Sequence, residues 1–146
     1  FLFATLLWPA FCRTWMKLQA DGVHAVEAQR RAADRVTLHQ LSTIALPRRF
    51  SLPMQEIWLL QARFPLRQRK RVTRTLSHPR FRAAFDFLVL RQTASDAHSA
   101  DVAFWEEAQH DPDNAIALYP GEDETDGEAE APRKRRRRRR APVAAG

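Results

Sequence analysis

The chain is poor in the residues that build several common kinds of site. It has one cysteine in 146 residues, Cys12, which excludes an intrachain disulfide and fits a reducing compartment. Nucleotidyl transfer needs paired carboxylates for metal ions and a glycine-rich turn for the triphosphate. The four glycines of this chain are scattered, so it lacks such a turn. Its five histidines have no zinc-site spacing with cysteine or acids. We therefore expect no catalytic residue, cofactor or metal site in this chain.

Long hydrophobic runs are also missing. Residues 1–11 are apolar but are interrupted by Pro9, and eleven residues are too few to span a bilayer. The same stretch lacks the basic leader and the small-residue cleavage site of a signal peptide. We therefore expect no membrane insertion. Because the chain begins at Phe1 instead of methionine, we interpret it as a piece of a longer protein whose upstream part is missing.

Charge is distributed in blocks of opposite sign. Residues 48–82 carry ten lysines and arginines against one acid, whereas residues 111–131 carry eight acids and no base. Residues 132–146 carry eight bases and no acid. A stretch this basic is either solvated or bound to a polyanion such as a nucleic acid. We further predict that the acidic segment 122–130 competes for the terminal arginines.

Hydrophobic periodicity predicts an all-α fold with five to six helices and a disordered tail. A helix ends near Trp8 and Pro9 opens the next one. Further helices are expected over 23–46, 52–63, 66–76 and 79–91, with Ser51 and Ser77 as N-caps, and from Ser95 or Ser99 to Gln109. Residues 111–146 are too polar to form a core, and we predict that they are disordered. The resulting regions are 1–46, 47–110 and 111–146.

The basic helix expected over 66–76 is the best candidate for a site. At 100° per residue, four of its basic side chains fall within one quadrant, without acids at i±4 to neutralise them: Arg67, Lys70, Arg71 and Arg74. This quadrant is either a phosphate-binding stripe or a solvated face. Arg69 points to the opposite apolar arc, where an ion pair with Glu56 or Asp86 is expected. Trp58 and the aromatics of the next helix should form the core, with Phe87 the least buried.

Several short motifs in this stretch resemble those of a known family. They are Met54-Gln-Glu-Ile-Trp58, Leu60-Gln61, Arg67-Gln68, Lys70-Arg71, His78-Pro79, Phe81-Arg-Ala-Ala84 and Leu90-Arg91. Together with the polybasic end, they resemble the arginine-rich C-terminal region of bacterial poly(A) polymerases, in the tRNA nucleotidyltransferase/poly(A) polymerase superfamily. The resemblance is strong over 47–91, moderate over 1–46 and only compositional beyond 110.

The resemblance implies a function that the residues alone leave open. It implies the RNA-binding C-terminal region of a cytoplasmic bacterial polynucleotide adenylyltransferase, which acts in RNA polyadenylation, mRNA processing and turnover. ATP and Mg²⁺ would then bind the missing catalytic head, and this chain alone would be inactive. Single-stranded RNA 3′ ends are the expected partner, with the RNA-decay machinery as a further candidate. The predicted RNA-binding residues are Arg63, Arg67, Lys70, Arg71, Arg74, Arg80, Arg82, Arg133, Lys134, Arg135, Arg136, Arg137, Arg138, Arg139 and Arg140.

Two other interpretations fit the same charge pattern. The first is a stand-alone basic RNA-binding adaptor without an attached enzyme. The second is a membrane-surface protein that uses its basic helix and tail, because a polybasic run binds any polyanion, including an acidic bilayer.

Overall fold

The computed structural model describes residues 1–44 and 47–120, and within these ranges every regular element is helical. The all-α prediction is therefore confirmed. The elements are α1 (Leu2–Ala20), α2 (Ala25–Leu41), α3 (Arg48–Gln61), α4 (Arg69–Leu76), α5 (Phe81–Ala94), the 3₁₀ helix η1 (Asp96–His98), α6 (Ser99–Ala108) and α7 (Pro112–Leu118). None of them is both long and apolar enough to cross a bilayer.

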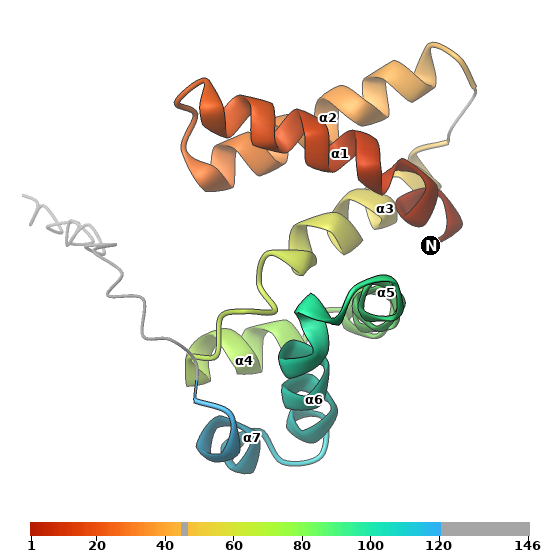
Figure 1. The fold of residues 1–146 in the computed structure, drawn as a ribbon. Coiled ribbons are helices and arrows are strands. Elements are labelled where there is room, and N and C mark those ends of the chain that lie inside the picture. Colours follow the sequence, from red (N-terminus) through yellow and green to blue (C-terminus); the bar gives the residue numbers. More distant parts are fainter. Residues whose placement is uncertain (45–46, 121–146) are drawn as a thin grey trace, which may run out of the picture.

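The helices form two groups that meet along α3. Helices α1 and α2 lie antiparallel, joined by a turn at Gly22, whose φ of +84° suits a residue without a side chain. Helix α3 packs against this hairpin and against α5, and the shorter helices α4, α6 and α7 gather beyond it (Figure 1). The basic stretch after α3 therefore lies in the smaller group, away from the α1–α2 hairpin.

Two fully buried tryptophans connect elements that are distant in sequence. The indole nitrogen of Trp58 in α3 donates to the carbonyl of Ala4 in α1 at 2.8 Å. The indole nitrogen of Trp105 in α6 donates to the carbonyl of Phe64, after α3, also at 2.8 Å. Each bond satisfies the one polar atom of a large buried ring, so both rings can fill the core. The prediction that Trp58 belongs to the core is confirmed.

Several predicted helix ends are wrong. Pro9 lies inside α1, and Ser51 lies inside α3, which begins after Pro47. Ser77 ends α4, and α5 begins at Phe81. These serines satisfied the residue preference of an N-cap, but neighbouring residues were already helical, so no helix began at them.

The expected exposure of Phe87 is also wrong. This residue is 2% exposed, less than Phe81 and Phe85. Its ring lies edge-on to Trp8 at 5.3 Å and to Phe1 at 6.3 Å, both from the start of the chain. Helix α5 is therefore covered by α1 on one side and by the smaller helices on the other.

The last described helix, α7, was not predicted. The side chain of Asp111 caps it, because Oδ1 accepts from the backbone amides of Asp113 and Asn114, each at 3.0 Å. Ala115 is fully buried and the ring of Tyr119 lies 6.5 Å from that of Phe104. The prediction of disorder from residue 111 is therefore wrong over this helix. The acidic segment 122–130 and the terminal arginines lie outside the described residues.

Candidate functional site

Arg67 lies outside the helix on which the predicted stripe was drawn. Helix α4 begins at Arg69, and Gln68 before it has an extended backbone with ψ of 135°. Positions before Arg69 therefore do not follow the helical spacing. Arg67 Nη2 instead pairs with Asp101 Oδ1 at 3.1 Å, and the two side chains are only 13% and 15% exposed. Its other terminal nitrogen, Nη1, donates to the carbonyl of Tyr119 at 3.2 Å, so this side chain joins three segments of the fold.

Arg69 has the exposed position that was expected of Arg67. It pairs with Asp113 Oδ1 at 2.7 Å, and the two side chains are 71% and 62% exposed. The predicted internal ion pair of Arg69 with Glu56 or Asp86 is therefore wrong.

Those two acids pair with other predicted RNA-binding residues. Arg80 Nε lies 3.1 Å from Glu56 Oε2, and Arg82 Nε lies 3.1 Å from Asp86 Oδ1. Both contacts are at the surface, where an ion pair contributes little stability but reduces the local positive charge. Arg80 and Arg82 are accordingly weaker candidates for phosphate contact than the count of bases suggested.

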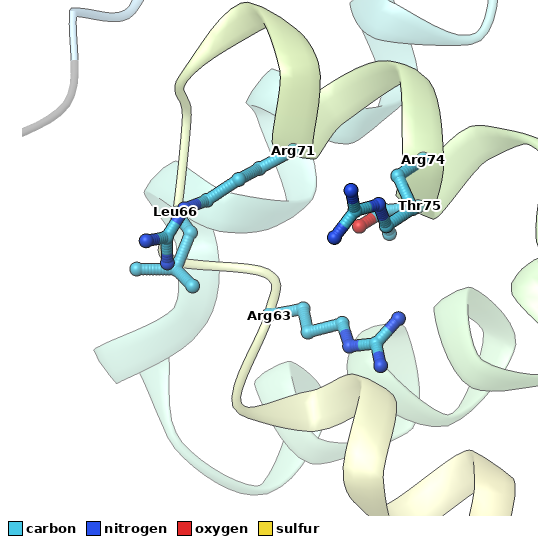
Figure 2. Close-up of a pocket in the computed structure, with 5 residues that line it drawn as sticks. All are labelled: Arg63, Leu66, Arg71, Arg74 and Thr75. Atoms are coloured by element: carbon cyan, nitrogen blue, oxygen red, sulfur yellow. The ribbon is translucent and has the colours of Figure 1, made fainter. Parts of the chain in front are cut away.

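Three of the predicted basic residues line one cleft between the turn after α3 and helix α4. The cleft has a volume of about 230 Å³. Its lining residues are Arg63, Leu66, Arg71, Arg74 and Thr75. In Figure 2, Arg63 and Arg74 extend into the same space from opposite walls, and Arg71 runs beside Leu66. Lys70, also predicted, is exposed on α4 but is not one of the lining residues.

Arginines give the cleft its positive charge. None of the described residues that line it carries a carboxylate. Over residues 1–44 and 47–120, neither Arg63 nor Arg74 forms an ion pair with an acid. Two guanidinium groups that face one space repel each other, and an anion between them would remove that repulsion. The cleft is therefore suited to an anionic ligand.

A second, more open cleft differs in charge. It has a volume of about 570 Å³, and its lining residues include Arg82 together with the acids Glu106 and Glu107. Opposite charges in one cleft neutralise each other, so it has no comparable attraction for an anion.

The described residues provide no metal centre. They contain no group of three or more histidines, cysteines, aspartates or glutamates placed to hold an ion. The Asp111-Pro-Asp113 pair, which has the spacing of a metal-binding motif, is used otherwise: Asp111 caps α7 and Asp113 pairs with Arg69.

Comparison with known proteins assigns the chain to a family. The family model described as the polymerase A arginine-rich C-terminus matches residues 21–141. The chain belongs to this family. Within the match fall all the helices from α2 to α7, and with them the cleft between the turn after α3 and α4.

Curated relatives of this member of the polymerase A arginine-rich C-terminus family are much longer than the chain. Poly(A) polymerase I of Escherichia coli O6:H1 is 38% identical over 92 residues, which are 62% of this chain and 20% of the relative. The proteins of the same name from Salmonella typhimurium and Haemophilus influenzae are 35% and 30% identical over 107 and 106 residues. The chain thus spans about a fifth to a quarter of the length of these relatives.

Thr75 is the polar lining residue of the cleft that the sequence did not predict. It follows Arg74 directly and lies four residues after Arg71, so helical spacing places it beside the basic face. Attention to basic residues alone left this neutral position out.

Proposed function

We propose that this chain is the RNA-binding region of a cytoplasmic bacterial poly(A) polymerase and that the α3–α4 cleft contacts RNA phosphates. The family and the names of the relatives support the polymerase. The cleft supports phosphate contact, because Arg63 and Arg74 extend into one space and none of its described lining residues is an acid. Adenylate transfer, with ATP and Mg²⁺, would belong to the longer part of such an enzyme, and 3′ ends of single-stranded RNA would be its substrate.

RNA binding can be tested by measuring affinity as a function of salt. Each phosphate contact with a single strand contributes about 0.7 to the slope of log affinity against log salt. We therefore expect R63Q/R74Q to reduce the slope by up to about 1.4 and to weaken binding to fluorescein-labelled oligo(A), measured by anisotropy. Glutamine keeps good helix propensity, so α4 should remain folded.

A matched control separates a local site from overall charge. Arg30 and Arg35 are exposed on α2, in the other group of helices, and R30Q/R35Q removes the same two charges. This control should change the slope much less than R63Q/R74Q. Equal effects of the two double variants would contradict a site at the cleft and would leave only attraction by net charge.

Two further measurements test the rest of the proposal. The chain incubated with ATP, Mg²⁺ and an RNA primer should not extend the primer, and robust extension would contradict the assignment of catalysis to another part of the enzyme. The fraction of protein that binds anionic vesicles, measured by sedimentation, should be smaller than the fraction that binds oligo(A), measured by anisotropy at an equal concentration of phosphate groups. Stronger vesicle binding would favour a membrane-surface protein.

A further inference from the structure

We propose that the α3–α4 cleft holds one phosphate group in a defined seat, formed by Arg63, Arg74 and the hydroxyl of Thr75. This inference rests on the proposed function, since it names how the cleft would hold RNA. It goes further because it adds a neutral hydrogen-bond donor at a fixed place. A surface that attracted RNA by charge alone would not depend on that hydroxyl.

Thr75 is exceptional among the threonines that the structure describes. The six others each donate a side-chain hydrogen bond to a backbone carbonyl three or four residues earlier: Thr5, Thr14, Thr37, Thr43, Thr73 and Thr93. Within the described ranges, the hydroxyl of Thr75 has no hydrogen-bond partner. Thr75 is nevertheless only 1% exposed.

The hydroxyl oxygen of Thr75 is open to the cleft. Among the described residues, the buried side-chain atoms without a partner are Trp15 Nε1, Gln29 Nε2 and Arg67 Nε, and the Thr75 oxygen is not one of them. A hydroxyl that no protein group uses and that is accessible from the cleft is free to donate to a ligand there. Because Thr75 lines the cleft, its hydroxyl can reach such a ligand without any change in the fold.

The three groups converge on one place. Thr75, Arg63 and Arg74 all line the same cleft, and in Figure 2 Arg63 extends into it from the wall opposite Arg74 and Thr75. Guanidinium groups bind phosphate oxygens with paired, charge-assisted hydrogen bonds, and a hydroxyl can donate to a further oxygen of the same group. Two cations and one donor around a space of about 230 Å³ therefore match a phosphate group with part of its sugar.

The deciding variant is T75V, which removes the hydroxyl but keeps the shape and the charge. One hydrogen bond to a charged group corresponds to about a tenfold loss of affinity for oligo(A). The salt slope should stay unchanged, since no charge is lost. T75S, which restores the hydroxyl, should bind as the native chain does.

The matched control is T73V on the same helix. Thr73 is exposed and its hydroxyl donates to the carbonyl of Arg69 at 3.1 Å, so it does not take part in the cleft. T73V should bind RNA normally. Thermal unfolding followed by circular dichroism should give T75V a melting temperature no lower than the native one, and T75A serves as a second variant if valine unfolds the chain.

A competition arm identifies the source of the phosphate. Inorganic phosphate is added to the RNA complex, with sodium chloride as the control at equal ionic strength. Displacement of RNA by phosphate from the native chain, lost in T75V, would show that the seat also takes free phosphate. If phosphate does not compete while T75V still weakens oligo(A), the seat takes the phosphodiester of RNA. Both results support the seat.

The two proposals fail in distinguishable ways. If R63Q/R74Q weakens RNA binding but T75V binds as the native chain does, the RNA surface stands and the seat is refuted. If neither variant changes binding, both the surface and the seat are refuted.

Discussion

Replacing Arg67 with methionine should destabilise the fold far more than replacing Arg69 with glutamine. R67M leaves the carboxylate of Asp101, which is 15% exposed, without its cationic partner, and leaves the carbonyl of Tyr119 without its donor. Removing one partner of a buried ion pair costs about 3–5 kcal/mol. The partial exposure of this pair places the expected loss near the lower end, at about 3 kcal/mol.

The comparison with Arg69 controls for the loss of one positive charge near α4. The pair of Arg69 with Asp113 is more than three-fifths exposed on both sides, so R69Q should cost no more than about 1 kcal/mol. For a domain of this size, about 4 °C in melting temperature corresponds to 1 kcal/mol. R67M should therefore melt about 12 °C below the native chain and R69Q within about 4 °C of it.

Urea unfolding followed at 222 nm, with the double variant R67M/D101L, completes the test. Removing both members of a buried pair in favour of apolar side chains is often neutral, so the double variant should recover most of the stability lost in R67M. The reasoning would be refuted if R67M were no less stable than R69Q. It would also be refuted if R67M/D101L lost as much stability as R67M and D101L do separately, added together.

Three smaller predictions concern the α1, α3 and α5 side of the molecule. His98 accepts at Nε2 from Arg91, 2.8 Å away, and is therefore neutral, and burial and then Arg91 lower its pKa. Its contribution to stability is therefore present above about pH 6.5 and is lost as the pH falls below that value. H98Q should make the free energy of unfolding depend less on pH below about 6.5. Burial raises the pKa of the Cys12 thiol, so iodoacetamide should alkylate it more slowly than free cysteine at pH 8, and equal rates would contradict its packing. W58F should lose about 1–2 kcal/mol in urea unfolding, because it removes the bond to Ala4.

Helix content could be predicted from sequence because it depends on local periodicity, whereas the helix ends could not. Ser51 and Ser77 have the residue type of an N-cap, but packing extended helices through or up to them. The misplacement of Arg67 has the same origin, since a helical projection from residue 66 assigns directions to residues that are not helical. An error of three residues in a helix start was enough to exchange the expected roles of Arg67 and Arg69.

The sequence contains a start signal for helix α7, but the acidic composition that follows favoured a prediction of disorder. Asp111 followed by proline is a strong start for a helix, with an N-cap side chain and a preorganised first residue. The strongly acidic composition after 111 hid it, because composition averages over a window longer than the helix. Thr75 was missed for another reason: the proposal for it depends on the absence of a local hydrogen bond, which the sequence does not show.

The contact between Arg67 and Tyr119 also has a mechanical consequence. Arg67 holds the carbonyl of Tyr119 at 3.2 Å, and its sequence neighbour Leu66 is a wall of the cleft. The end of the last described helix is therefore held next to the residue that follows Leu66 in the sequence. A force applied to the chain at Tyr119 would act on its hydrogen bond with Arg67 and, through Arg67, on the neighbouring cleft wall at Leu66.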